Sequence, residues 1–143
     1  MTSKRYKLMS VELSVICPIY NEEKYISQFI ESLLKQDYPK ENLEILLVDG
    51  MSKDHTREIV ADYISKYPFI RLIDNPQKIV PYAMNRGIEA AKGDVIIRLD
   101  AHASYQSDYF SVLVKGLQRL HADNVGTVAP HAGEGVVRIG LTV

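Results

Sequence analysis

The sequence predicts an α/β fold: a doubly wound, mostly parallel sheet with helices on both faces. Two observations support this fold class. Short apolar runs rich in Ile, Val and Leu are typical of parallel strands that are buried on both sides. These runs alternate with segments of helical periodicity, which is the pattern of crossover helices packed on the two faces of such a sheet.

The apolar runs place the strands. We expect four buried strands, over residues 13–19, 43–48, 69–73 and 95–99, and a weaker apolar stretch near 125–128. With 143 residues, the chain is long enough for one domain that buries roughly two thirds of its unfolded surface.

Amphipathic stripes place the first two helices. The first is expected over 22–36, with Asn21 as its N-cap and two glutamates in its first turn, where negative charge is favourable. The second is expected to follow Asp54, a residue type that caps helices, and to end before Pro68.

Proline and glycine mark the third helix, which is expected over about 81–92. Pro81 at its start and Gly93 after its end are the residue types common at these positions. A fourth helix over about 108–121 carries an apolar stripe that can cover the sheet.

Composition indicates a soluble domain without a charge-driven partner. The chain is 46% apolar and 24% charged, and its net charge of −1 gives no general attraction to nucleic acid or to an anionic membrane. The single cysteine, Cys17, lies in the first apolar run and is expected to be a buried small hydrophobe. We find no signal-peptide core and no run of roughly 18 apolar residues that would span a membrane. We therefore expect a cytoplasmic domain that does not bind nucleic acid.

Polar residues gather where the expected strands end. Asp100-Ala101-His102 follows the run 95–99, and Asp49 follows the run 43–48. Ligands of open α/β sheets bind at the carboxyl ends of the strands, so these side chains are expected at one rim. An acid followed by an imidazole two residues later can hold a divalent cation, and such a cation can neutralise the diphosphate of a nucleotide-sugar.

The loop after the first strand contains no glycine. A Rossmann phosphate cradle needs glycines there, and no Walker-type loop occurs elsewhere in the chain. A bound diphosphate would therefore need another source of positive charge. We expect Mn²⁺ or Mg²⁺, with Mn²⁺ the better match for a histidine ligand.

Each candidate residue also has a purely structural interpretation. Asp49 can be a strand-end turn residue, and Asp54 fits a helix cap better than a ligand. Asn85 and Gly87 can serve helix packing, and His102 taken alone fits a surface histidine. The prediction of a ligand site depends on the whole set of residues.

Five short motifs occur in an order that resembles a known family. They are Pro18-Ile-Tyr-Asn-Glu22, Val48-Asp-Gly50 with Ser52-Lys-Asp-His-Thr56, Asn85-Arg-Gly87, Gly93-Asp94 and Leu99-Asp-Ala-His102. Together they resemble the donor-binding part of a family 2 inverting glycosyltransferase with the GT-A fold. The Asp-Ala-His variant is similar to that of succinoglycan-type exopolysaccharide glycosyltransferases. The resemblance covers about residues 11–126, which leaves an N-terminal extension, 1–10, and an atypical tail, 127–143.

The resemblance implies a role for each motif. Asp49 would hydrogen-bond the base or ribose, and Asp100 would hold the donor diphosphate and, with His102, the metal. His102 stands where the common Asp-x-Asp form has its second acid. Many relatives carry an arginine at the position of Met84, and Arg86 is a candidate to supply that positive charge. The full nucleotide-sugar-binding set is Pro18, Ile19, Tyr20, Asn21, Glu22, Asp49, Asn85, Arg86 and Asp100.

The activity that the resemblance implies is a metal-assisted, inverting sugar transfer. The donor would be a nucleotide-diphosphate sugar, expected to be a UDP-sugar, and the acceptor a saccharide or lipid-linked molecule in cell-surface polysaccharide synthesis. Such a transfer needs a general base. In the family this base lies well beyond the metal motif, so we expect it beyond the end of this chain and assign no catalytic residue.

Two alternatives come from other classes of function. A non-catalytic nucleotide-sugar-binding fragment that lacks the general base stays open. A nucleotidyltransferase on a related sheet is disfavoured, because such enzymes usually have a glycine-rich first loop.

Relative to the family pattern, the chain is expected to be truncated. Any peripheral association with the inner face of the membrane would then come from segments absent from this chain. A sheet that ends after a fifth strand leaves an unpaired edge and uncovered apolar helix faces, which favours self-association.

Overall fold

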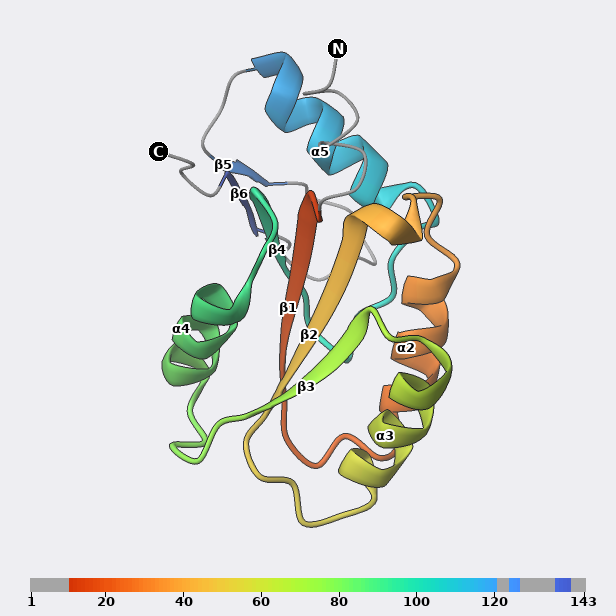
Figure 1. Cartoon of the computed structure of the whole chain (residues 1–143), viewed down its shortest axis with the longest axis vertical. Helices are drawn as coiled ribbons and strands as arrows, with labels where there is room; N and C mark the ends of the chain where they lie inside the picture. The colour runs from red at the N-terminus through yellow and green to blue at the C-terminus, as the bar shows by residue number, and fades with distance from the viewer. Residues whose placement is uncertain (1–10, 121–123, 127–135, 140–143) are drawn as a thin grey trace.

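The computed structural model confirms the predicted α/β fold class. It describes residues 11–120, 124–126 and 136–139. These residues form a six-stranded sheet with the strand order β3-β2-β1-β4-β6-β5. Figure 1 shows helices on both sides of this sheet.

The four predicted strands are present, each within one residue of its expected ends. They are β1 (Leu13–Ile19), β2 (Leu43–Asp49), β3 (Ile70–Asp74) and β4 (Val95–Arg98). β1 pairs in parallel with β2 on one side and with β4 on the other, and β2 pairs in parallel with β3. Every residue of β2 is buried, as expected for a near-continuous apolar run inside a parallel sheet.

Alternate side chains of β1 face two separate cores. Val15 and Cys17 belong to the larger core, which includes Phe29 and Phe110. Ile16 faces the smaller core, which includes Ala83. The larger core is covered by α2 (Ile26–Leu34), α3 (Thr56–Lys66) and α5 (Tyr109–Leu120), and the smaller by α4 (Val80–Ala90) (Figure 1).

The first helix starts later than predicted, at Ile26 rather than at residue 22. Asn21 does not cap it: its φ is 49°, and its Oδ1 accepts a hydrogen bond from the Lys53 amide at 2.9 Å. The glutamates at 22 and 23 precede the helix, so its first turn contains no acid. Tertiary hydrogen bonds to the loop after β2 therefore overrode the local capping signal.

The loop after β1 is fastened to the start of α3. The Glu22 amide donates to Thr56 Oγ1 at 2.8 Å, and the Glu23 amide donates to Asp54 Oδ2 at 3.3 Å. Asp54 also accepts from the amide of Thr56, the first residue of α3, as a helix-capping aspartate would. Burial alone would raise the pKa of Asp54, but the hydrogen bonds from Thr56 outweigh it and lower that pKa. Glu23 in turn contacts His55 Nδ1 at 2.8 Å.

Two further strands complete the sheet: β5 (Asn124–Gly126) and β6 (Val136–Ile139). β6 lies between β4 and β5 and is antiparallel to both. The apolar stretch expected near 125–128 overlaps β5, and residues 127 and 128 lie outside the described part. β6 comes from the segment that the sequence assigns to a tail, and the domain division at residue 126 stays a prediction. Within the described residues, no helix is long and apolar enough to cross a membrane.

Gly87 supports the packing of α4 on the sheet, as its structural interpretation predicts. A Cβ at this position would lie 2.6 Å from Cγ2 of Ile16, which is fully buried in β1.

We predict that Gly87→Ala destabilises the protein, because overpacking costs about 1–3 kcal/mol and outweighs the ~1 kcal/mol gain in helix propensity. Urea denaturation of Gly87→Ala, Ile16→Ala and the double variant measures the change in the free energy of unfolding. The loss of unfolding free energy in the double variant should be smaller than the sum of the losses in the two single variants, because removing the Ile16 side chain makes room for the new Cβ. Strictly additive losses would show that position 87 and Ile16 are not in contact.

The Glu23–His55 contact predicts a pH-dependent interaction. The hydrogen bond that His55 donates to the Glu23 carboxylate, and the charges of Glu58 and Glu23, raise the pKa of His55. The contact therefore stabilises the fold below the ordinary histidine pKa, and this contribution disappears as the pH rises through the raised value. In an NMR titration, Glu23→Gln should lower the pKa of His55 towards its ordinary value. An unchanged titration would show that the contact does not form in solution.

Candidate functional site

Most of the predicted site residues lie at the rim formed by the carboxyl ends of the parallel strands, whereas Asn85 and Arg86 lie on α4 (Val80–Ala90). The loop 20–25 follows β1, Asp49 ends β2, and Asp100 lies shortly after β4. The strand order changes direction at β1, because β2 and β3 lie on one side of it and β4 on the other. Open α/β sheets bind ligands at this kind of topological switch point.

A cavity of about 120 Å³ lies beside the first loop. Four of the predicted residues line it, namely Pro18, Ile19, Tyr20 and Glu22. The other lining residues come from the end of β2, the loop after β3 and the start of α4: Val48, Gly50, Asn75, Lys78, Ile79, Val80 and Ala83. The structure therefore joins the first predicted motif to the loop after β3.

Glu22 links the first loop to the Asp-Ala-His motif. His102 Nε2 lies 2.9 Å from Glu22 Oε1 and 2.9 Å from Oε2. The Asp100 Oδ1 atom accepts a hydrogen bond from the His102 amide at 2.8 Å. Glu22 and His102 are thus in contact where the chain leaves β1 and β4, and Asp100 precedes His102 by two residues.

The carboxylates of Asp100 and Glu22 lie near the buried Cys17 of β1. Burial raises the pKa of Cys17, and the charges of Asp100 and Glu22 raise it further. Tyr105 holds the backbone of this region, because its hydroxyl accepts a hydrogen bond from the Asp100 amide at 2.9 Å. Burial is also the main cause of the raised pKa of Tyr105.

The donor set at this rim has the right chemistry for a divalent cation. The Asp100 carboxylate and the His102 imidazole match the ligand types that Mn²⁺ accepts. Within the described part of the chain, no three His, Cys, Asp or Glu side chains are already arranged as a metal site. The residues present therefore fit the implied cation by donor type.

Asp49 lies at the rim, but its side chain is fully buried. Its carboxylate accepts hydrogen bonds from the amide and hydroxyl of Ser52, and it pairs with Arg57 Nη1 at 2.8 Å. Arg57 also pairs with Asp74 at the end of β3 at 2.7 Å, and these two carboxylates raise the pKa of Arg57. This arrangement matches the structural interpretation of Asp49, and its predicted contact with the nucleotide stays a prediction.

The other predicted residues lie outside the cavity. Asn21 is exposed and its amide donates to Ser52 Oγ at 2.8 Å. Asn85 is exposed on α4, while the Arg86 guanidinium bonds Gln77 Oε1 in the loop after β3, with Nη2 at 2.9 Å. The structure does not bring Asn85 or Arg86 to the Glu22–His102 contact through any hydrogen bond among the described residues.

Asn75 is a candidate that the sequence motifs did not indicate. It lines the cavity and is only 1% exposed. Its Nδ2 donates to the Ile79 carbonyl at 3.1 Å, which leaves Oδ1 buried without a hydrogen-bond partner. Buried polar atoms are nearly always paired, so this acceptor is unusual. Its position directly after β3 was the only signal in the sequence.

The loop that carries Asn75 has a constrained backbone. Lys78 has a φ of 67°, and the Ile79 amide bonds the Gln77 carbonyl at 2.9 Å, which closes a tight turn. A side chain on Gly50 would meet the Tyr20 ring at 3.3 Å and the Lys78 backbone at 3.5 Å. Gly50 therefore lets the first loop and the loop after β3 approach each other around the cavity.

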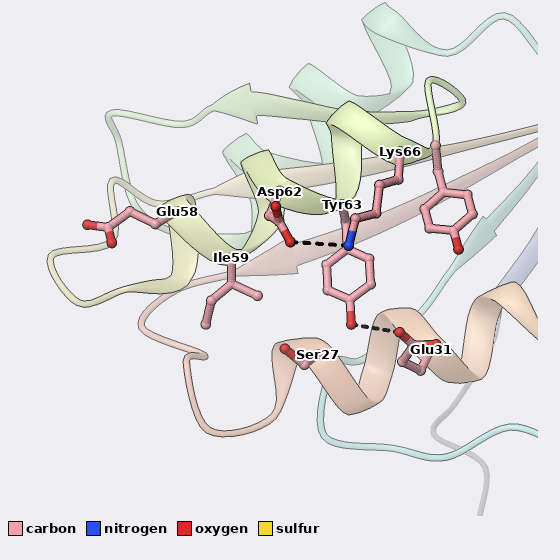
Figure 2. Close-up of a pocket in the computed structure, with 8 residues that line it drawn as sticks. Ser27, Glu31, Glu58, Ile59, Asp62, Tyr63 and Lys66 are labelled. Carbon is pink, nitrogen blue, oxygen red and sulfur yellow. Dashed lines mark hydrogen bonds and ion pairs between the residues drawn. The ribbon is translucent and has the colours of Figure 1, made fainter.

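A larger cavity, of about 450 Å³, lies between α2 and α3. Figure 2 shows Tyr63 pointing across it to Glu31, with which it forms a hydrogen bond of 2.8 Å, and an ion pair between Lys66 and Asp62. None of the predicted site residues lines this cavity. Four of them, Pro18, Ile19, Tyr20 and Glu22, instead line the smaller cavity at the strand ends.

Comparison with known proteins agrees with the motifs. Residues 14–142 match the family described as glycosyl transferase family 2. Over 110 residues the chain is 40% identical to the dolichyl N-acetyl-α-D-glucosaminyl phosphate 3-β-D-2,3-diacetamido-2,3-dideoxy-β-D-glucuronosyltransferase of Methanococcus voltae, covering 76% of this chain and 34% of that protein. Over 121 residues it is 35% identical to succinoglycan biosynthesis protein ExoA of Rhizobium meliloti (strain 1021), covering 83% and 36%. The chain thus spans about a third of the length of these curated relatives.

Solved structures show the same fold. The mannosyltransferase PcManGT from Pyrobaculum calidifontis, in complex with GDP-Man and Mn²⁺, is similar with a TM-score of 0.82 at 24% identity, over 90% of this chain and 44% of that one. Staphylococcus aureus TarS 1–349, in complex with UDP-GlcNAc, is similar with a TM-score of 0.71 at 28% identity, over 80% and 33%. From the ordered motifs, the placement of three of them at one rim and the match over most of its length, we conclude that this chain belongs to glycosyl transferase family 2.

Proposed function

We propose that this chain is the donor-binding part of a metal-assisted, inverting glycosyltransferase that uses a UDP-sugar. The observation that carries the proposal is the contact between Glu22 and His102, which joins the two predicted motifs at the topological switch point. Membership of the family supports the reaction class.

The acceptor that we propose is a saccharide or a lipid-linked sugar in cell-surface polysaccharide synthesis. The name of the relative from Methanococcus voltae specifies a dolichyl N-acetyl-α-D-glucosaminyl phosphate, and that of the relative from Rhizobium meliloti specifies succinoglycan biosynthesis. We place the reaction in the cytoplasm, at the inner face of the membrane where the acceptor is lipid-linked. No described residue is assigned as the general base.

We place the nucleotide base in the cavity of about 120 Å³. The exposed Tyr20 ring offers an aromatic surface on one side of it, and the unpaired Asn75 Oδ1 offers an acceptor for an N–H of the base. Asp49 and Arg57 would then act indirectly, by holding the ends of β2 and β3 in register around the cavity.

We assign the cation to Asp100 and His102. A divalent cation bound there supplies the positive charge that the donor diphosphate needs as it leaves. Asp100 is exposed and follows the strand that pairs with β1, so it can reach a diphosphate whose base lies beside the first loop. The TarS complex with UDP-GlcNAc supports a uridine donor on this fold.

Titration calorimetry tests the proposed function directly. UDP, UDP-GlcNAc and GDP-mannose would each be titrated into the folded chain with Mn²⁺ and with EDTA. We expect binding of the uridine nucleotides that depends on Mn²⁺. Binding of GDP-mannose alone would overturn the uridine assignment, and no binding of any nucleotide to a folded sample would overturn the function.

Asp100 provides the first variant test. We predict that Asp100→Asn weakens Mn²⁺-dependent UDP binding by at least about 10-fold, because a ligand carboxylate is lost, whereas the melting temperature stays the same. Asp94→Asn is the matched control, since Asp94 is an exposed aspartate at the amino end of the same strand. Equal losses in the two variants would contradict the role of Asp100.

Asn75 provides a test of base recognition. Wild-type protein should bind UDP about 10-fold more tightly than N3-methyl-UDP, because methylation removes one hydrogen bond worth about 1 kcal/mol and leaves a buried acceptor unpaired. In Asn75→Ala this ratio should fall, which calorimetry with both nucleotides measures. If Asn75 had a purely structural role, Asn75→Ala would weaken the binding of both nucleotides and leave the ratio of their affinities unchanged.

A further inference from the structure

We propose that Glu22 is a positioning residue for His102, which makes Nδ1 the imidazole nitrogen that faces the divalent cation. The inference rests on the proposed function for the presence of a cation, and it adds a third residue and a specific ring nitrogen to that site. Glu22 itself would act through His102 and need not touch the metal.

The first observation is the geometry of the contact. His102 Nε2 lies 2.9 Å from Glu22 Oε1, within hydrogen-bond geometry. A carboxylate oxygen can only accept, so Nε2 must carry the proton and donate. In the neutral ring the lone pair is then on Nδ1, and among the described residues Nδ1 has no hydrogen-bond partner.

The second observation is the burial of Glu22. Its side chain is only 13% exposed, whereas that of His102 is 55% exposed. Its buried Oε2 forms no hydrogen bond although it lies 2.9 Å from His102 Nε2, and no lysine or arginine pairs with the carboxylate among the described ion pairs. A desolvated carboxylate needs a donor or a positive charge, and the His102 ring is what it meets.

The third observation is that both partners are held in place. The Glu22 amide is fixed by the fully buried Thr56, and the His102 amide is fixed by Asp100 Oδ1. The Tyr25 ring lies edge-on to the His102 ring, with centroids 4.8 Å apart. The ring is therefore restrained at its backbone, on its face and at Nε2, and the nitrogen that is left free is Nδ1.

Metal-ligating histidines generally donate their second ring N–H to a carboxylate, a backbone carbonyl or water, which sets the tautomer and the orientation of the ring. Loss of such a partner typically lowers metal affinity by about 10- to 100-fold. Glu22 and His102 reproduce this arrangement from two different loops. The loop after β1 would thus raise the affinity of the loop after β4 for a divalent cation.

The tautomer of His102 tests the inference without metal or nucleotide. ¹⁵N NMR of the ring nitrogens at a pH of about 9, above the usual range of imidazole titration, distinguishes a protonated from an unprotonated nitrogen. We expect the Nε2–H form in the wild-type chain and a mixture of both tautomers in Glu22→Ala. A wild-type His102 in the Nδ1–H form would overturn the proposal, and this measurement needs no variant to fold.

Metal affinity is the second readout. Mn²⁺ alone would be titrated into the wild-type chain, Glu22→Ala and Glu22→Gln, with free Mn²⁺ measured by electron paramagnetic resonance. We expect Mn²⁺ to bind about 10- to 100-fold more weakly to Glu22→Ala. Glu22→Gln, which keeps an oxygen acceptor for Nε2–H, should retain part of the affinity.

Glu23→Ala is the matched control. Glu23 is the next residue along the same loop, and it also contacts a histidine, His55, at 2.8 Å. This variant should leave both the His102 tautomer and the Mn²⁺ affinity unchanged. Equal losses in Glu22→Ala and Glu23→Ala would mean that the loop as a whole is disturbed, which overturns the specific role of Glu22.

The two readouts separate this inference from the proposed function. If the wild-type chain shows the Nε2–H tautomer but binds no Mn²⁺, the cation assignment fails while the Glu22–His102 contact stands. If Mn²⁺ binds and Glu22→Ala retains full affinity, the proposed function stands and the positioning role of Glu22 is wrong.

Discussion

The parallel pairing of β1 with both β2 and β4 is the constraint on which the site depends. Ile19 pairs with Asp49, and Ile16 pairs with Arg98, so the loops that follow all three strands leave the sheet at the same edge. The chain reaches β2 through α2 on one face and β4 through α4 on the other. This change of face opens the rim between the two loops, and the Glu22–His102 contact lies across it.

The acids at this rim divide into two groups by their partners. Asp49 and Asp74 both pair with Arg57, which links the ends of β2 and β3, and Asp54 accepts hydrogen bonds from Thr56 at the start of α3. Asp100 remains exposed, and Glu22 is matched only by an imidazole. The internally paired acids thus fix the loops beside the exposed Asp100 and the Glu22–His102 contact.

Much of this arrangement could be predicted from particular residues. The apolar runs predicted four strands to within one residue, because strands buried on both faces leave an almost unbroken hydrophobic signature. Asp100 and His102 could be singled out because they follow such a run. The helix cap at Asn21 was wrong, since Lys53 and Ser52, more than 30 residues away, take the polar groups that a local cap would have used.

By itself, the sequence determined the fold class, the four parallel strands and the rim that follows them, because periodicity and strand-end residues are local properties. Only the tertiary structure decided which of those residues share a site. Asp49 turned inward to Arg57, Asn75 entered the cavity with an unpaired oxygen, and Glu22 met His102 across 80 positions of the chain. These outcomes follow from strand order and from the competition of buried polar groups for hydrogen-bond partners. Neither can be predicted from residues that are neighbours in the sequence.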